Sequence, residues 1–191
     1  MVENINDALE LYAEREAKFS SFGAAVLKRR DRFLDGLDDV VNLLGLPESY
    51  ARCAREIRME GVALGYFDLC PGDTQDLCRS LLRLNGDGRN PVLPVNLLSV
   101  AAFDADIVAV TKGSPHHATG TVYFVDVTTS SKPQISAIAD NFVDFLVLAG
   151  ALDQAVLEDY DEPETMVGAL ALRLGCEGYA EKWKLIARMA V

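Results

Sequence analysis

Histidine is nearly absent from this chain of 191 residues, and the two that occur, His116 and His117, are adjacent. Neighbouring side chains of an extended segment point in opposite directions, so this pair is poorly suited to hold one metal ion. The sequence also lacks the glycine-x-serine-x-glycine elbow of α/β hydrolases and both common glycine-rich phosphate loops. These absences predict a protein that is not an enzyme and that binds no metal or cofactor. We expect the two histidines to be solvated loop residues, with partner contact and metal binding as the alternatives.

No cysteine stands in a C-x-x-C pair, which disfavours a zinc site. Cys53, Cys70, Cys78 and Cys176 are therefore expected to be small, partly buried thiols in a reducing compartment. The first residues show no basic segment followed by an apolar run, so no secretory signal is predicted. No apolar stretch reaches the roughly 20 residues that span a bilayer. The expected location is the cytoplasm, without membrane attachment.

Positive charge is scarce: the chain has 18 Lys and Arg residues against 29 Asp and Glu, which gives a net charge of −11. Such a surface repels phosphate backbones and disfavours direct binding of nucleic acid. It suits attraction to a basic protein, although it also simply keeps a protein soluble. The densest acidic segment surrounds one aromatic residue and comprises Glu158, Asp159, Tyr160, Asp161 and Glu162. This segment is either a charged linker or a contact for a basic partner.

Hydrophobic periodicity predicts helices first, then clustered strands, then helices again. The strand with the clearest composition, 121–127, is apolar on both faces and is therefore expected to be central in its sheet. This order lacks the regular alternation of a parallel sheet, so we predict an α+β fold with a mainly antiparallel sheet packed against helices. The expected helices are 3–20, 24–44, 47–61, 75–84, 165–174 and 177–189, and the expected strands are 62–69, 106–111 and 121–127.

One further helix is predicted after residue 135. Ser136 is the expected N-cap, and Asp140 and Asp144 are expected to face solvent. The core-facing stripe follows helical spacing and comprises Ile138, Phe142, Phe145, Leu146 and Ala149.

Three segments of the chain resemble the SUKH superfamily. The first is LPESYARCAREI (46–57), which is similar to its leucine-proline-x-x-tyrosine helix, and the others are TVYFVDV (121–127) and ISAIADNFVDFL (135–146). Phe142, Phe145 and Leu146 match the closing motif of the superfamily, and Asn141 replaces its frequent serine. The likeness covers about residues 40–150. The sequence departs from the pattern in its MEGVALG segment, its long KGSPHHATG loop and the position of its single tryptophan, Trp183.

The resemblance implies one SUKH-like domain over residues 1–191, with a core at about 40–150 and helical extensions at 1–39 and 151–191. Members include a yeast cell-wall assembly regulator and bacterial immunity proteins that silence toxins, often nucleases. The superfamily pattern contains no catalytic residues, so none is carried over. We expect an immunity-type protein that occludes the active face of a basic toxin, using residues 158–162 and, as a second patch, the loop of His116 and His117. The alternative is a regulatory or scaffold binding module with no toxin partner.

Overall fold

The computed structural model describes residues 4–20, 27–64, 66–72, 75–113, 120–129 and 132–190, with the side chains of 14–20 excepted. Its helices are α1 (Ile5–Ser20), α2 (Leu37–Leu44), α3 (Glu48–Glu56), α4 (Leu77–Asn85), α5 (Phe142–Leu157), α6 (Pro163–Arg173) and α7 (Ala180–Met189), with a 3-10 turn, η1, at Glu177–Tyr179. Its strands are β1 (Lys28–Arg29), β2 (Ile57–Arg58), β3 (Ala63–Leu64), β4 (Phe67–Asp68), β5 (Leu97–Phe103), β6 (Asp106–Thr111), β7 (Val122–Asp126) and β8 (Gln134–Ala139).

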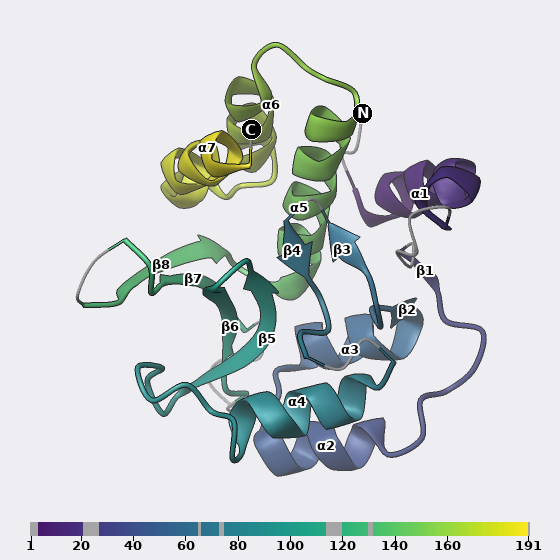
Figure 1. Cartoon of the computed structure of the whole chain (residues 1–191), viewed down its shortest axis with the longest axis vertical. Helices are drawn as coiled ribbons and strands as arrows, with labels where there is room; N and C mark the ends of the chain where they lie inside the picture. The colour runs from purple at the N-terminus through teal and green to yellow at the C-terminus, as the bar shows by residue number, and fades with distance from the viewer. Residues whose placement is uncertain are drawn as a thin grey trace.

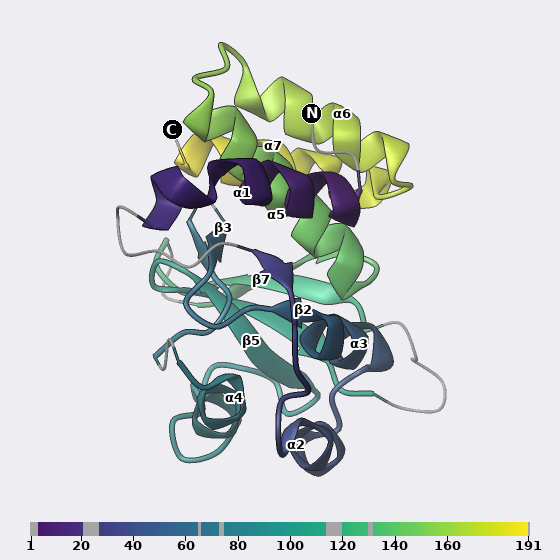
Figure 2. The same cartoon turned by 90° about the vertical axis from the view of Figure 1, so that its right-hand side faces the viewer.

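The described strands form a small β1–β2 pair and a larger sheet in the order β3-β4-β5-β6-β7-β8. Every neighbouring pair is antiparallel, so the predicted α+β class with an antiparallel sheet is confirmed. Figures 1 and 2 show α1, α5, α6 and α7 toward one end of the molecule and α2 and α4 toward the other, with the large sheet at the height between them. β7 has a neighbour on each side, as its apolar faces predict.

The N-terminal third is less helical than the sequence predicts. Within the expected helix 24–44, residues 27–36 are not helical, and α2 begins only after Gly36, whose φ of 77° is left-handed. The helix expected to reach Gly61 ends at Glu56 and continues as strand β2. The expected strand 62–69 is two short strands, β3 and β4, which pair with each other. The predicted stop at Gly45 is confirmed, with φ of 71°.

A buried ion pair explains why the chain after Leu27 leaves the helical path. Arg30 Nη1 and Nη2 donate to the two carboxylate oxygens of Glu60, at 2.9 and 3.0 Å. The same guanidinium donates to the carbonyl oxygens of Ala54 and Ile57 at the end of α3. Both charged side chains are less than 10% exposed. A long-range contact therefore overrides the helical propensity of the local sequence.

The start of α5 also differs from the prediction. Ser136 is not a cap but lies in strand β8, and Ile138 belongs to that strand rather than to the helix. Asn141 is the N-cap, because its Oδ1 accepts hydrogen bonds from Val143 N and Asp144 N. Asp144 is half-buried rather than solvent-facing and accepts a 2.6 Å bond from Asn141 Nδ2.

The main core lies between α5, α7 and one face of the large sheet. Phe145 of α5 and Phe67 of β4 pack edge to face with ring centroids 5.2 Å apart. Trp183 of α7 is fully buried against the same rings and donates its Nε1–H to the carbonyl oxygen of Ile138 in β8 at 2.6 Å. The tryptophan that the sequence places outside the sheet region thus packs onto the sheet from the last helix. Phe124 of β7 belongs to the same buried cluster.

The opposite face of the sheet carries a smaller apolar cluster. Leu93, from the connection between α4 and β5, covers Leu97, Ile107 and Val125. Arg89 holds that connection in place, because its Nη2 donates to the carbonyl oxygens of Leu93, Pro94 and Leu97.

Candidate functional site

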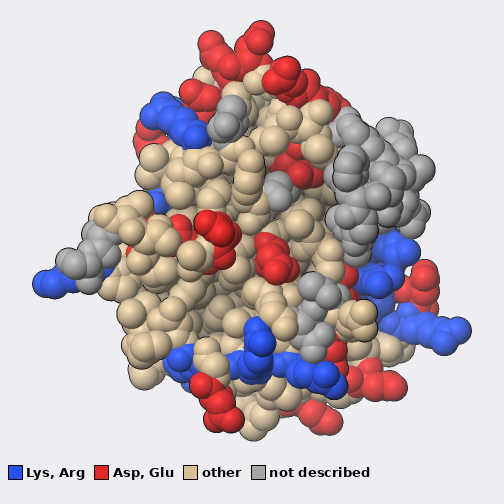
Figure 3. Space-filling model, viewed as in Figure 1, with Lys and Arg blue, Asp and Glu red and all other residues tan. Residues whose placement is uncertain are grey.

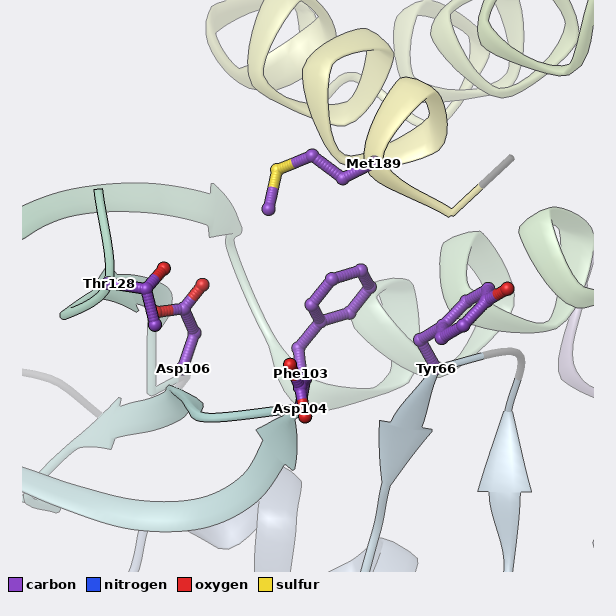
Figure 4. A pocket seen from close by; sticks show the side chains of 6 residues that line it. All are labelled: Tyr66, Phe103, Asp104, Asp106, Thr128 and Met189. Atoms are coloured by element: carbon purple, nitrogen blue, oxygen red, sulfur yellow. The ribbon is translucent and has the colours of Figure 1, made fainter.

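A pocket of about 410 Å³ opens where four separate segments of the chain meet. Tyr66 comes from the β3–β4 turn, Phe103 from the end of β5, Thr128 from the segment after β7, and Met189 from the end of α7. Figure 4 shows Phe103 between Tyr66 on one wall and the Asp106–Thr128 pair on the other, with Met189 above. The tyrosine ring lies 5.8 Å from the phenylalanine ring and is 51% exposed. The pocket therefore has aromatic and thioether walls open to solvent.

Two aspartates supply the charge of the pocket. Asp104 and Asp106 flank Ala105 in the turn that joins β5 to β6, where Phe103 pairs with Asp106. Asp106 is only 3% exposed, and its Oδ1 accepts a 2.8 Å bond from Val127 N. No described residue donates a hydrogen bond to its Oδ2. In Figure 4 the carboxylate of Asp106 lies beside the side chain of Thr128, on the other side of Phe103 from Tyr66.

The backbone at Asp104 is strained. Its φ of 51° is left-handed, a region that residues other than glycine occupy at a cost of about 1–3 kcal/mol. Among the described residues that are not glycine, only Asp104 and Asp159 have a positive φ. Both aspartates are exposed.

A cation already sits on the aromatic cluster next to the pocket. Lys182 Nζ of α7 lies 4.8 Å from the ring centroid of Phe124, which packs 5.7 Å from Phe103. Asp126 follows Phe124 by two residues and is a fixed carboxylate: it accepts bonds from Thr129 Oγ1 and from two backbone N–H groups. The Thr129 hydroxyl bond is the main reason why the pKa of Asp126 is lowered, so this group is ionised at neutral pH.

The predicted acidic contact, residues 158–162, forms the connection between α5 and α6. Asp159 N donates to Val156 O and Tyr160 N donates to Ala155 O, which together with the left-handed Asp159 make a Schellman cap on α5. Glu158, Asp159, Asp161 and Glu162 are exposed, and Tyr160 is half-buried. The acidic segment is therefore a shaped helix end and not an extended linker.

The acidic connection leads into α6, and the pocket includes a residue of the neighbouring helix α7. Glu164, in the first turn of α6, is 3.7 Å from Nε of Arg188, and Arg188 precedes the pocket residue Met189. Figure 3 shows acidic side chains gathered at the top of this face, around the α5–α6 connection, with others near its middle. We call residues 158–162 together with the pocket the acidic face.

The cysteines match their prediction as free thiols. Cys53, Cys70 and Cys176 are buried and Cys78 is partly exposed. Burial raises the pKa of Cys53 to about 12, so its thiol is protonated and poorly nucleophilic at neutral pH. In the described part of the chain, no three His, Cys, Asp or Glu residues converge as a metal site.

The predicted second patch, His116 and His117, lies outside the described residues. The structure does describe the two glycines that flank it, and both approach the start of α3. Gly113 N donates to Gly45 O at 2.6 Å, and a Cβ at Gly120 would lie 2.4 Å from Pro47 Cβ.

Sequence reasoning found the acidic connection but missed the pocket. Its residues come from four segments between Tyr66 and Met189, so no local pattern marks them. The only sequence signal was the Asp-Ala-Asp turn at the start of a predicted strand.

Comparison with known proteins identifies no relative. No family model matches the chain, and no curated protein or solved structure matches it either. No helix among the described residues combines the length and the apolar character needed to cross a bilayer.

Proposed function

We propose that this chain is a non-catalytic, SUKH-like binding domain of the immunity type, which neutralises a toxin by covering its active face. The observation that carries the proposal is the pair of left-handed aspartates, Asp104 and Asp159, one in the pocket and one at the acidic helix end. Folding alone favours glycine at such positions. Strained backbone that presents a charge to solvent is typical of residues retained for an interaction.

The partner that fits this surface is a basic protein. A nuclease toxin holds phosphates in its cleft and so carries Lys and Arg there, which complement the exposed Glu158, Asp159, Asp161 and Glu162. These carboxylates would raise the association rate, while the aromatic pocket would supply lasting contact through Tyr66, the more exposed of its two rings. Such a partner would be met in the cytoplasm, and the negative surface disfavours direct binding of nucleic acid.

A matched pair of charge reversals tests the role of the acidic face. Asp161 is exposed and makes no hydrogen bond or ion pair within the described part of the chain, so Asp161→Lys changes charge without removing a contact seen there. Asp87, in the loop after α4, is equally exposed and serves as the control. The assay is co-purification with the product of the adjacent reading frame, together with rescue of growth when that product is expressed.

We expect the wild type to bind and protect, and Asp161→Lys to slow association about tenfold at low salt while Asp87→Lys has little effect. Binding without protection would favour the alternative, a regulatory or scaffold module of the same fold. If the two variants behave alike, the acidic face is not the contact surface.

A further inference from the structure

The pocket has a free carboxylate oxygen inside it and aromatic walls around it. Asp106 is almost fully buried, yet its Oδ2 has no hydrogen-bond donor among the described residues. This oxygen is not among the fully buried unpartnered atoms, so it is open to the pocket and can accept N–H groups from a charged ligand. The nearby Asp104 adds a second negative charge at the rim.

The walls indicate which cation fits. Tyr66 presents a half-exposed ring beside Phe103, and Met189 faces them across the pocket, as Figure 4 shows. A planar guanidinium can stack on an aromatic ring while its N–H groups pair with a carboxylate, whereas an ammonium acts as a point charge. Lys182 of α7 is already placed over the neighbouring ring of Phe124.

We propose that the pocket receives an arginine side chain of the partner protein. Its guanidinium donates to Oδ2 of Asp106 beside the ring of Phe103, and its apolar stem lies along Tyr66 and Met189. This inference rests on the proposed function, because it names the anchor by which the acidic face holds its partner. Arginine is also enriched among the residues that dominate protein interfaces.

The test titrates the full chain with N-acetyl-arginine methylamide and follows the backbone amide signals of the protein by NMR. We expect saturable shifts at residues 66, 103–106 and 128, with a dissociation constant on the order of 1–10 mM. The norleucine amide has an apolar stem without charge and should not bind. The lysine amide should bind more weakly than arginine.

Asp106→Asn is the decisive variant. An asparagine retains an oxygen for Val127 N, so the turn is kept while the charge is removed. We expect at least a tenfold loss of affinity, against no more than a twofold change in Asp87→Asn. Tyr66→Ala should also lose affinity, while Phe33→Ala, which truncates a side chain that is 89% exposed elsewhere, should not.

Each remaining result has a defined meaning. No shift at these residues with 50 mM probe overturns the inference, and so does equal binding of the norleucine amide. Binding of agmatine more than tenfold tighter than the arginine amide would assign the pocket to a small free guanidinium compound instead. The titration needs no protein partner, so its failure is separate from a failure of the Asp161→Lys capture experiment.

Discussion

Replacing Asp159 with glycine should stabilise the protein. The φ of 54° at Asp159 costs an aspartate about 1–2 kcal/mol that glycine does not incur. Removing a negative charge from the C-terminal end of α5 adds about 0.3–0.5 kcal/mol. Against this, glycine gives the unfolded chain more conformational entropy, which costs about 0.4–1 kcal/mol. The net expectation is a gain of about 1 kcal/mol, or roughly 2–4 °C in Tm for a domain of this size.

Two further variants separate the contributions of charge, backbone conformation and chain entropy to this gain. Asp159→Asn removes the charge but keeps a residue that tolerates left-handed backbone, so it should gain about 0.5 kcal/mol. Asp161→Gly falls where φ is not positive, so it should lose roughly 0.5 kcal/mol through chain entropy. Urea unfolding at pH 7 measures all three. If Asp159→Gly is no more stable than the wild type, or if it behaves like Asp161→Gly, the cost assigned to the backbone is wrong. The capture assay should be run on the same variant. If Asp159→Gly is more stable but binds the partner less well than the wild type, the backbone strain at Asp159 is linked to binding.

Three other substitutions have defined outcomes. Arg30→Ala leaves Glu60 buried without its bidentate partner and should cost about 3–5 kcal/mol in urea unfolding, more than any loss from Glu60→Gln. Tyr50→Phe removes a fully buried hydroxyl that has no hydrogen-bond partner among the described residues. It should therefore raise the free energy of unfolding by about 1 kcal/mol. A lower free energy of unfolding would show that the hydroxyl does have a partner. Burial raises the pKa of Asp144, so its ionisation opposes folding as pH rises; Asp144→Asn should be the more stable form at pH 7, with the difference vanishing as pH falls below about 3.9.

The sequence predicts the fold class because several elements have strong local signals. Asp106–Thr111 and Val122–Asp126 are rich in β-branched residues and form strands as expected. The apolar stripe that includes Phe142 and Phe145 packs on the sheet. Helix α7 falls within its predicted range, and α6 begins two residues earlier than predicted. In these segments, local preference and tertiary contacts agree.

The elements that were missed depend on partners far away in sequence. The sequence predicts a helix at β8 because Ser136 is a good cap residue, but pairing of Tyr123 with Ala137 makes the segment a strand. β5 has apolar residues on both faces, so it shows no alternation; it is buried because β4 and β6 flank it. The pocket depends on these same pairings, since the β5–β6 turn carries Asp104 and Asp106, and it therefore could not be predicted before the sheet was known.

The residues that resemble the SUKH pattern contact one another inside the core. The rings of Tyr50 and Phe142, from the first and last matching segments, pack edge to face with centroids 4.6 Å apart. Pro47 is buried where Gly120 approaches it, so the leucine-proline-x-x-tyrosine helix also anchors the chain just before β7. Such contacts hold the fold together, because these side chains are buried in the core and do not reach the acidic face. Under the proposed function, the partner would be recognised by residues outside the three matching segments, such as the exposed Asp104 and Asp159.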